Sequence, residues 1–237
     1  MGNCEIFRQQ DDIMSPIGML EDKYQNFEPL VRGLVHEIRN PVQGILASAD
    51  ALRCIHEENP TTNELLEMVQ QECVRINQVL TDLLDLARPV NINRLKTESL
   101  TQVLEESIRN FQKLNPSIQW TNEIRSDPYP IYMDQRSLRR AILAILQNAG
   151  ESKPNNVLIR VVSERMKQSI RLTFEDNGDG ISPEHLDHVI QPFYSTRPKK
   201  SGLGLSIAER IVQSHGGELQ IESIKQGGTA VIIVLPV

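Results

Sequence analysis

The sequence lacks features that would place it in several common functional classes. Its longest uninterrupted apolar run, Ala230 to Leu235, is far too short to cross a bilayer, and no signal peptide is visible at its start. Basic residues are not in excess: 25 Lys and Arg stand against 31 Asp and Glu, and the net charge of −6 argues against nucleic acid as the main partner. We therefore expect a cytoplasmic protein without a direct membrane span.

Cysteine and the best-known phosphate-binding motifs are also scarce or missing. The three cysteines, Cys4, Cys54 and Cys73, do not have metal-ligand spacing, which favours free thiols in a reducing compartment. The chain contains no Gly-x-x-x-x-Gly-Lys-Ser/Thr loop and no protein-kinase His-Arg-Asp or Asp-Phe-Gly set. Any phosphate chemistry must therefore use another kind of site.

What is present indicates a globular protein of one or two domains. The chain has 237 residues, of which 39% are hydrophobic, enough for a real core. The pattern changes near Asn91, where long helical periodicity gives way to short strands and helices. We divide the chain into a tail at 1–15, a helical hairpin at 16–90 and a mixed domain at 91–237.

Two long helices are predicted before that change. The first starts near Ser15-Pro16 and runs to about Glu58. The second starts from a capping box formed by Thr61 and Glu64 and ends at Arg88-Pro89. Apolar residues repeat at steps of three and four along both helices: Phe27, Val31, Leu34, Ile38, Val42, Ile45, Ala49 and Leu52, then Leu66, Val69, Cys73, Ile76, Leu80, Leu83 and Ala87.

One such hairpin leaves apolar surface exposed. We therefore expect two chains to pair their hairpins as a four-helix bundle in a homodimer. The alternative is a bundle within one chain, but the remaining sequence offers no two further helices of that length.

The first helix carries a histidine beside a carboxylate, His36-Glu37, with Asn40-Pro41 one turn later. His36 lies off the apolar stripe and should reach solvent. Pro41 has no N–H, so the carbonyl of Glu37 loses its helical partner and the helix should bend there. By itself the pattern also fits an ordinary surface histidine on a kinked helix.

The second half of the chain predicts a two-layer α/β sandwich, which makes the chain α+β as a whole. Two strands around a turn are expected at 118–124 and 130–133, followed by a helix capped by Asp134 that ends near Gly150. Further strands are expected at 157–163, 169–175, 218–224 and 229–235, and helices at 183–190 and 204–215, the latter closed by Gly216-Gly217.

Four short clusters in this half could carry chemistry. Asn148 offers an amide oxygen suited to Mg²⁺, and Asp176 opens an Asp-Asn-Gly-Asp-Gly turn whose carboxylate could accept from a purine amino group. Gly202 to Ser206 leads into a helix N-terminus, which binds phosphate through free N–H groups. The fourth cluster, Gly227 to Thr229, reads alone as a turn, and the basic loop between Pro192 and Ser201 could be a lid or a solvated loop.

Taken in order, the clusters resemble the conserved boxes of the sensor histidine kinases of two-component signalling. The H-box is His36 to Pro41, the N-box surrounds Asn148-Ala149, and the first G-box is Asp176 to Gly180. The F-box lies near Pro192-Phe193, the second G-box is Gly202 to Leu205, and Pro192 to Thr196 looks closest to the nitrogen-regulation branch. The resemblance covers the chain from about Leu20 and implies a dimerisation and phosphotransfer hairpin followed by an ATP-binding domain of the gyrase and chaperone kind.

The resemblance assigns a role to individual residues. His36 would be the phosphoacceptor for ATP, Glu37 would orient it or take its proton, and Asn40 would aim a water at the phospho-aspartate of a response-regulator receiver domain. Asn148 would hold Mg²⁺, and Asp176, with Thr229 beside it, would read adenine. The remaining nucleotide contacts would come from Ser152, Gly178, Gly180, Lys199, Lys200, Gly202, Leu203, Gly204 and Leu205.

The sequence departs from the family at two positions near the phosphates. Ala144 stands where a second Asn is frequent, and Gly150-Glu151-Ser152 follows Asn148-Ala149 where the family often carries a basic or aromatic residue. The segment before the hairpin is too short for an input domain, so either a longer chain or a separate sensory protein is expected to supply the signal. Two other functions remain open, an ATPase of the same superfamily without phosphotransfer and a non-enzymatic ATP-binding dimeric scaffold.

Overall fold

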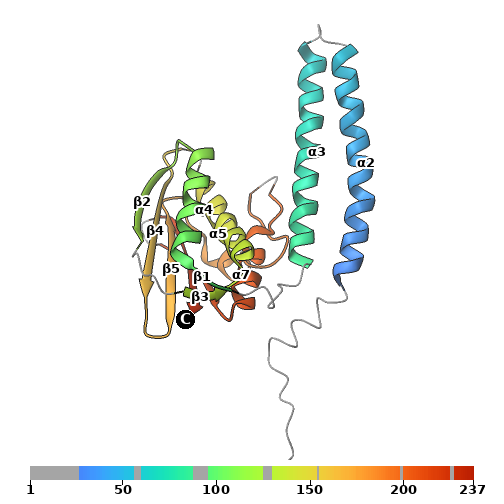
Figure 1. Cartoon of the computed structure of the whole chain (residues 1–237). Coiled ribbons are helices and arrows are strands. Elements are labelled where there is room, and N and C mark those ends of the chain that lie inside the picture. The colour runs from blue at the N-terminus through green and yellow to red at the C-terminus, as the bar shows by residue number, and fades with distance from the viewer. Residues whose placement is uncertain are drawn as a thin grey trace, which may run out of the picture.

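The computed structural model describes residues 27–55, 60–87, 96–124, 130–153, 155–197, 200–224 and 227–237. The described residues form a helical hairpin followed by an α/β domain, which confirms the predicted fold class (Figure 1). The predicted start of the first helix near Ser15 and its end near Glu58 lie outside these residues. None of the described helices is both long and apolar enough to cross a membrane.

The hairpin consists of α2 (Phe27–Ile55) and α3 (Pro60–Ala87), which lie side by side in opposite directions (Figure 1). Helix α2 continues through Pro41. Helix α3 begins at Pro60, so the prediction that Thr61 caps it from outside is wrong: a proline suits the first helical turn, where its missing N–H would have no partner.

The apolar stripes of the hairpin are divided between two environments. Side chains spaced seven residues apart face the other helix and are buried: Val35, Val42 and Ala49 on α2, and Leu66, Cys73, Leu80 and Ala87 on α3. Val35, which the predicted stripe omits, has 0% of its surface exposed. The other half of each stripe stays exposed: Leu34, Ile38, Ile45 and Leu52 on α2, and Val69 and Ile76 on α3.

The α/β domain contains a sheet of five strands in the order β2-β4-β5-β7-β6 and a separate pair, β1-β3. The strands are β1 (Lys96–Ser99), β2 (Gln119–Ile124), β3 (Pro130–Met133), β4 (Leu158–Arg165), β5 (Ser169–Asp176), β6 (Glu218–Ser223) and β7 (Thr229–Pro236). Strand β2 runs parallel to β4, and the other neighbours are antiparallel. The predicted hairpin of the strands at 118–124 and 130–133 is therefore wrong, because β3 pairs with β1 instead of β2.

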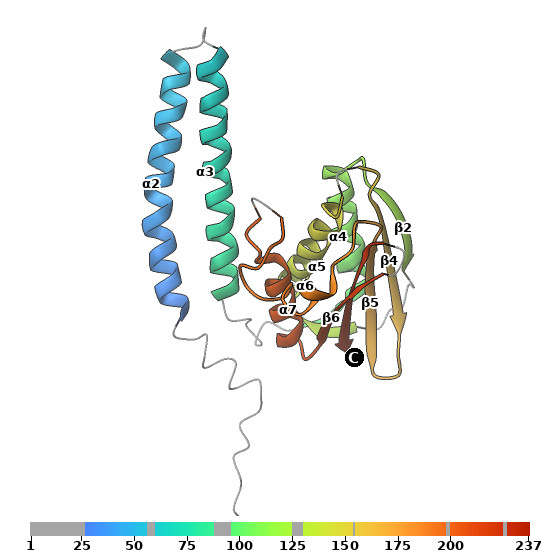
Figure 2. The same ribbon diagram turned by 180° about the vertical axis from the view of Figure 1, so that it is seen from behind.

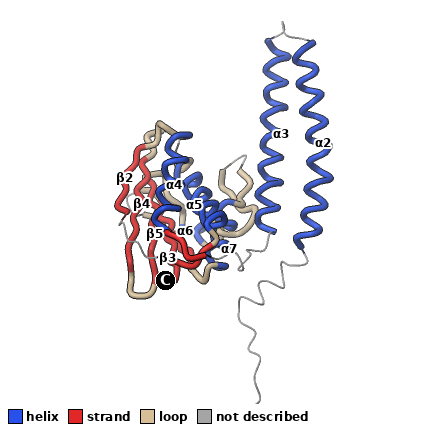
Figure 3. Tube along the Cα trace, in the orientation of Figure 1, coloured by secondary structure: helices blue, strands red, loops and turns tan. Residues whose placement is uncertain are grey.

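Three helices cover one face of the sheet, as the views from front and back show (Figures 1 and 2). They are α4 (Leu100–Leu114), α5 (Gln135–Gly150) and α7 (Gly204–Ser214); the short α6 (Pro183–Leu186) ends four residues before its predicted end at 190. The tube in Figure 3 shows helices gathered on one side and strands on the other, as expected for a two-layer sandwich.

Helix α4 is an element that the sequence interpretation missed. Ser99 caps it by accepting from the N–H of Gln102, and its buried side chains follow one another at alternating steps of three and one from Leu100 to Phe111. Its partner contacts include an ion pair between Arg139 of α5 and Glu106 of α4 at 2.6 Å. The apolar periodicity that identifies the other helices is present here as well.

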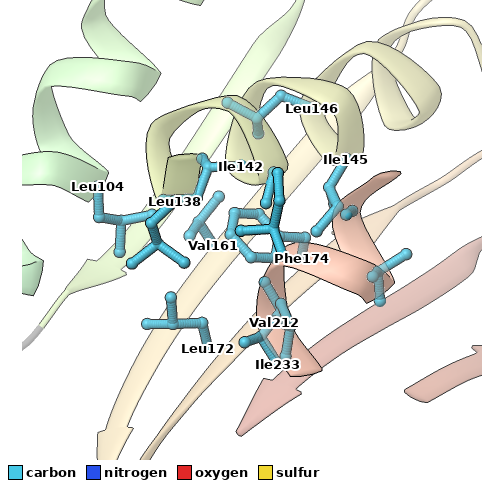
Figure 4. Packing of buried hydrophobic residues seen from close by; sticks show 14 of the residues in the cluster. Leu104, Leu138, Ile142, Ile145, Leu146, Val161, Leu172, Phe174, Val212 and Ile233 are labelled. Atoms are coloured by element: carbon cyan, nitrogen blue, oxygen red, sulfur yellow. The ribbon is translucent and has the colours of Figure 1, made fainter. Parts of the chain in front are cut away.

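The core lies between these helices and the sheet. Leu138, Ile142 and Ile145 of α5 point toward Leu172 and Phe174 of the sheet (Figure 4), and Leu146 belongs to the same buried cluster. In β5 the buried positions are Ile170, Leu172, Phe174 and finally Asp176, because alternate residues of a strand share one face. The strand therefore carries a carboxylate to the edge of the core.

A buried histidine joins the ends of two helices in the same layer. His215, which follows α7, accepts a hydrogen bond through Nε2 from the N–H of Asp134 at 2.9 Å, and its Nδ1 donates to the carbonyl of Ile211 at 2.7 Å. Asp134 caps α5 as predicted, by accepting from the N–H of Arg136. This arrangement fixes the start of α5 against the end of α7, and both helices contribute residues to the cavity described next.

Candidate active site

A cavity of about 710 Å³ opens beside α5, where β5, the loop after it and the start of α7 meet. It collects the predicted site residues Asn148, Asp176, Gly180, Lys200, Gly202, Gly204, Leu205 and Thr229. On α5 the lining side chains Arg140, Ala144 and Asn148 are spaced four residues apart, so one face of the helix forms a wall of the cavity.

Asp176 is the buried acid of this cavity, with 6% of its surface exposed. The N–H of Gly178 donates to its Oδ1 at 2.8 Å. Burial raises the pKa of Asp176, and hydrogen bonds from the backbone of Gly178 and Thr229 oppose that shift. A carboxylate in this position can accept a hydrogen bond from a donor that enters the cavity.

Gly228 shows why the Gly-Gly-Thr turn matters to this acid. Its φ is +108°, and a Cβ at this position would lie 2.0 Å from the carbonyl oxygen of Asp176. Only glycine permits so close an approach of the two backbones. The Gly227 to Thr229 segment, which by its sequence alone is only a turn, therefore places Thr229 beside Asp176.

The loop that follows α6 is closed at its base. The N–H of Phe193 donates to the carbonyl of Gly202 at 3.1 Å, and a Cβ on Gly202, whose φ is +67°, would lie 2.5 Å from the carbonyl oxygen of Tyr194. The hydroxyl of Tyr194 in turn bonds Nδ1 of His185 at 2.6 Å. The two ends of the loop predicted to be a lid, at Phe193 and Gly202, are thus held together.

One basic residue of this loop is already paired. Nζ of Lys200 lies 2.5 Å from Oε1 of Glu151, which follows α5. Arg197 also lines the cavity. Lys199 lies outside the described residues, so its predicted contact stays a prediction.

Three other predicted residues do not line the cavity. Leu203 is fully buried in the core. Ser152 is buried behind Gly178, where a Cβ on the glycine would lie 2.3 Å from that of Ser152. Ser152 and Gly178 therefore support the loop that carries Asp176.

Asn148 fits the predicted metal role in part. Its side chain faces the cavity and has no hydrogen bond to any described residue. The described residues contain no cluster of three His, Cys, Asp or Glu side chains able to hold a metal ion. A cation here would therefore take one amide oxygen from the protein and its other ligands from phosphate and water, as Mg²⁺ commonly does.

The predicted catalytic residues of the hairpin lie elsewhere. His36, Glu37 and Asn40 are exposed on α2, with His36 and Asn40 one turn apart, and none of the three lines the cavity. His36 reaches solvent as predicted.

The cavity is instead bordered by α3. Arg140 of α5 forms an ion pair with Asp85, and Oγ of Ser201 donates to Oδ2 of Asp82 at 3.2 Å. The sequence interpretation named none of the α3 residues at the cavity, because nothing in local spacing indicates which helix of the hairpin the second domain contacts.

The raised pKa of Asp176 predicts a gain in stability when its charge is removed. A carboxyl group whose pKa is higher in the folded state favours folding only at low pH, and this contribution is lost as the pH rises from the ordinary aspartate range through the raised value. Asp176→Asn should therefore raise the free energy of unfolding at pH 7, and the gain should shrink on acidification. Urea unfolding followed by the fluorescence of Trp120 measures this, with exposed Asp179→Asn as the control; a loss of stability at pH 7 would contradict the assignment.

This chain is similar to several known kinases. Sporulation kinase C of Bacillus subtilis is 30% identical over 210 residues, covering 87% of this chain and 48% of that protein. The signal transduction histidine-protein kinase AtoS of Escherichia coli is 29% identical over 211 residues, covering 88% of this chain and 34% of that protein. The chain thus spans about half or less of the length of these relatives.

Solved structures show the same fold. The mycobacterial sensor histidine kinase MprB matches 60% of this chain and 97% of its own, with a TM-score of 0.55 and 28% identity. Histidine kinase ThkA, in a complex with response regulator protein TrrA, matches 95% of this chain and 68% of its own with a TM-score of 0.67, and at 18% identity that match shows the fold alone.

Two family matches divide the chain in the same way as the fold. Residues 29–91 match the His Kinase A (phospho-acceptor) domain. Residues 133–237 match the histidine kinase-, DNA gyrase B- and HSP90-like ATPase. The branch within the family stays a prediction, but with both domains present in this order the chain belongs to the sensor histidine kinases.

Proposed function

We propose that this chain is an ATP-dependent protein-histidine kinase that phosphorylates His36 and passes the phosphoryl group to an aspartate of a response-regulator receiver domain. The observation that carries the proposal is the pairing of an exposed histidine on a helical hairpin with a cavity that ends in the buried carboxylate of Asp176. The family membership supports both halves.

The adenine of ATP is assigned to the Asp176 end of the cavity. Its exocyclic amino group donates to the carboxylate, whose burial strengthens a hydrogen bond that water would otherwise weaken. The close packing of Gly228 on the backbone of Asp176 keeps Thr229 within the same wall.

The phosphates are assigned to the opposite wall, between Asn148 and the start of α7. Gly202 and Gly204 precede free N–H groups at the N-terminus of α7, which favour anions. Asn148 would hold Mg²⁺, which neutralises charge on the phosphates during transfer. Lys200 and Arg197 lie on the same loop, and Lys200 must exchange Glu151 for phosphate to take part.

In the transfer step a ring nitrogen of His36 attacks the γ-phosphorus. The N–P bond forms as the bond from the γ-phosphorus to the β,γ-bridging oxygen breaks, ADP leaves, and the ring loses its proton to Glu37 or to water. A neutral imidazole is a competent nucleophile near pH 7. Because adjacent helical residues do not face each other, Glu37 has to curl back toward the ring to serve.

The proposed active form is a homodimer. The exposed halves of the two stripes lie next to the buried halves, as expected when each helix shares its apolar seam between its own hairpin and a second copy. A receiver domain and a sensory partner complete the proposed set of partners.

The dimer can be tested at the exposed stripe. Ile45 has 52% of its surface exposed in the single chain and would be buried in the bundle, so Ile45→Lys would place an unpaired charge there at a cost of several kcal/mol. We expect the mass in solution, measured by sedimentation equilibrium, to fall from dimer to monomer at micromolar concentration. Gln43 is exposed and lies off the stripe, so the Gln43→Lys variant should remain dimeric. Equal masses for the two variants would show that the exposed stripe is not the dimer interface.

His36→Gln tests the acceptor. With γ-labelled ATP and Mg²⁺ the variant should show no phosphorylation above background, because the nucleophile is gone, while calorimetry should show ATP binding within about twofold of wild type, since His36 lies outside the cavity. A variant that still becomes labelled would move the acceptor elsewhere, with His56 the next candidate.

Asn40→Ala separates two activities of one helix face. Asn40 lies one turn from His36, so a receiver domain docked at His36 brings its phospho-aspartate close to the amide. The variant should retain substantial autophosphorylation but lose most, about tenfold or more, of its phosphatase activity toward the phosphorylated regulator. The decay rate of purified phospho-regulator measures this. Equal rates with wild type and variant would contradict the proposal, and loss of both activities would show that Asn40 is needed for the structure of the helix instead.

A further inference from the structure

The proposed metal site has a single protein ligand, the neutral amide oxygen of Asn148. Mg²⁺ is commonly held by one or two carboxylates together with the phosphates of the substrate, so an amide alone is a weak donor set. Four of the described residues that line the cavity are acidic: Asp82, Asp85, Glu151 and Asp176. A carboxylate from this group would complete the site if it stood beside Asn148.

The positions of the four acids leave one candidate. Asp82 and Asp85 belong to α3 of the hairpin, where each already contacts a side chain of the ATPase domain. Asp176 is buried at the end of β5 and is assigned to adenine. Among the described acids of the ATPase domain, Glu151 is thus the one that lines the cavity at the phosphate end, beside Asn148.

Glu151 caps the C-terminus of α5, three residues after Asn148. Residues three apart are neighbours on a helix surface, and both of these line the cavity. The C-terminal end of a helix also carries partial negative charge, which favours a cation there. The helix therefore presents an amide oxygen and a carboxylate together at an end that attracts positive charge.

A cation of the lid now holds this carboxylate. Nζ of Lys200 lies 2.5 Å from Oε1 of Glu151, and the two side chains are 48% and 43% exposed. An ion pair so open to water contributes little to stability, so each partner can be exchanged for another group of the same charge. A divalent cation beside Asn148 would compete with Lys200 for the carboxylate.

We propose that Glu151 is a second ligand for Mg²⁺, and that the Glu151–Lys200 pair separates when ATP and Mg²⁺ bind. The carboxylate turns to the cation beside Asn148 and the ammonium group turns to the phosphates, so neither charge is left unpaired. The proposal rests on the kinase function proposed above. By linkage, the metal and the phosphates then strengthen each other's binding, because the cation releases Lys200 for the phosphates.

Calorimetry with the β,γ-imido analogue of ATP, with Mg²⁺ or with a chelator, measures this coupling. Glu151→Gln removes the carboxylate and frees Lys200, so the variant should bind the analogue about fivefold more tightly than wild type without metal. The gain in affinity that Mg²⁺ brings should fall about fivefold or more. Glu151→Asp, which keeps a carboxylate, should keep most of that gain, and exposed Glu105→Gln on α4, away from the cavity, should match wild type.

Lys200→Gln distinguishes a metal ligand from a residue that merely ties down the lid. This variant also breaks the pair, but it leaves the Glu151 carboxylate free for the cation, so its gain in affinity with Mg²⁺ should rise above that of wild type. The two substitutions thus shift the gain in opposite directions. If the pair only held the lid, both would release the lid and shift the gain in the same direction, which would overturn the proposal.

The outcomes separate this inference from the kinase function itself. Wild-type protein that does not bind the analogue under either condition would refute the proposed function and the metal site together. Wild type that binds the analogue but gains nothing from Mg²⁺, or a Glu151→Gln variant that keeps the full gain, would refute the role of Glu151 alone.

Discussion

The cavity proposed to hold ATP and the histidine proposed to accept its phosphoryl group belong to separate bodies, and this separation constrains how the molecule can work. The cavity is built by α5, α7 and the sheet, whereas His36 stands on α2. Between them lies α3, whose outer face closes the cavity with Asp82 and Asp85. For the proposed transfer to take place within this chain, one body has to move relative to the other, because the reacting atoms must come into contact.

Within the ATPase domain the site depends on the carboxylate of Asp176, which the fold keeps buried although water would solvate its charge better. Strand alternation carries Asp176 to the inner face of β5, after Leu172 and Phe174, which makes its charge costly. The backbone of Gly228 packs against its carbonyl, and Gly178 supplies an N–H, so the fold orients the acid. Burial of this carboxylate lowers the stability of the fold but provides a group that can recognise a ligand, which is common at functional sites.

Much of this could be predicted from the sequence because the decisive signals are local. Periodicity located the hairpin, and the resemblance of the glycine-rich clusters to the kinase boxes grouped Asp176, Gly202 and Thr229, which line one cavity in the structure. Pairing of β3 with β1 was missed because strand partners are set by tertiary packing. The contact of Arg140 with Asp85 could not be predicted for a related reason, because residue spacing does not indicate which surfaces of two domains meet.

The chemical nature of the phosphorylated residue tests the central claim most directly. Wild-type protein is incubated with γ-labelled ATP and Mg²⁺, and the labelled protein is then divided between acid and base. The account predicts label that is lost in acid and kept in base, as expected for a phosphorus–nitrogen bond to His36. Label that survives acid would indicate a phosphorus–oxygen ester on a hydroxyl side chain and would contradict histidine phosphorylation. Hydrolysis of ATP without any labelled protein would indicate an ATPase instead of a histidine kinase.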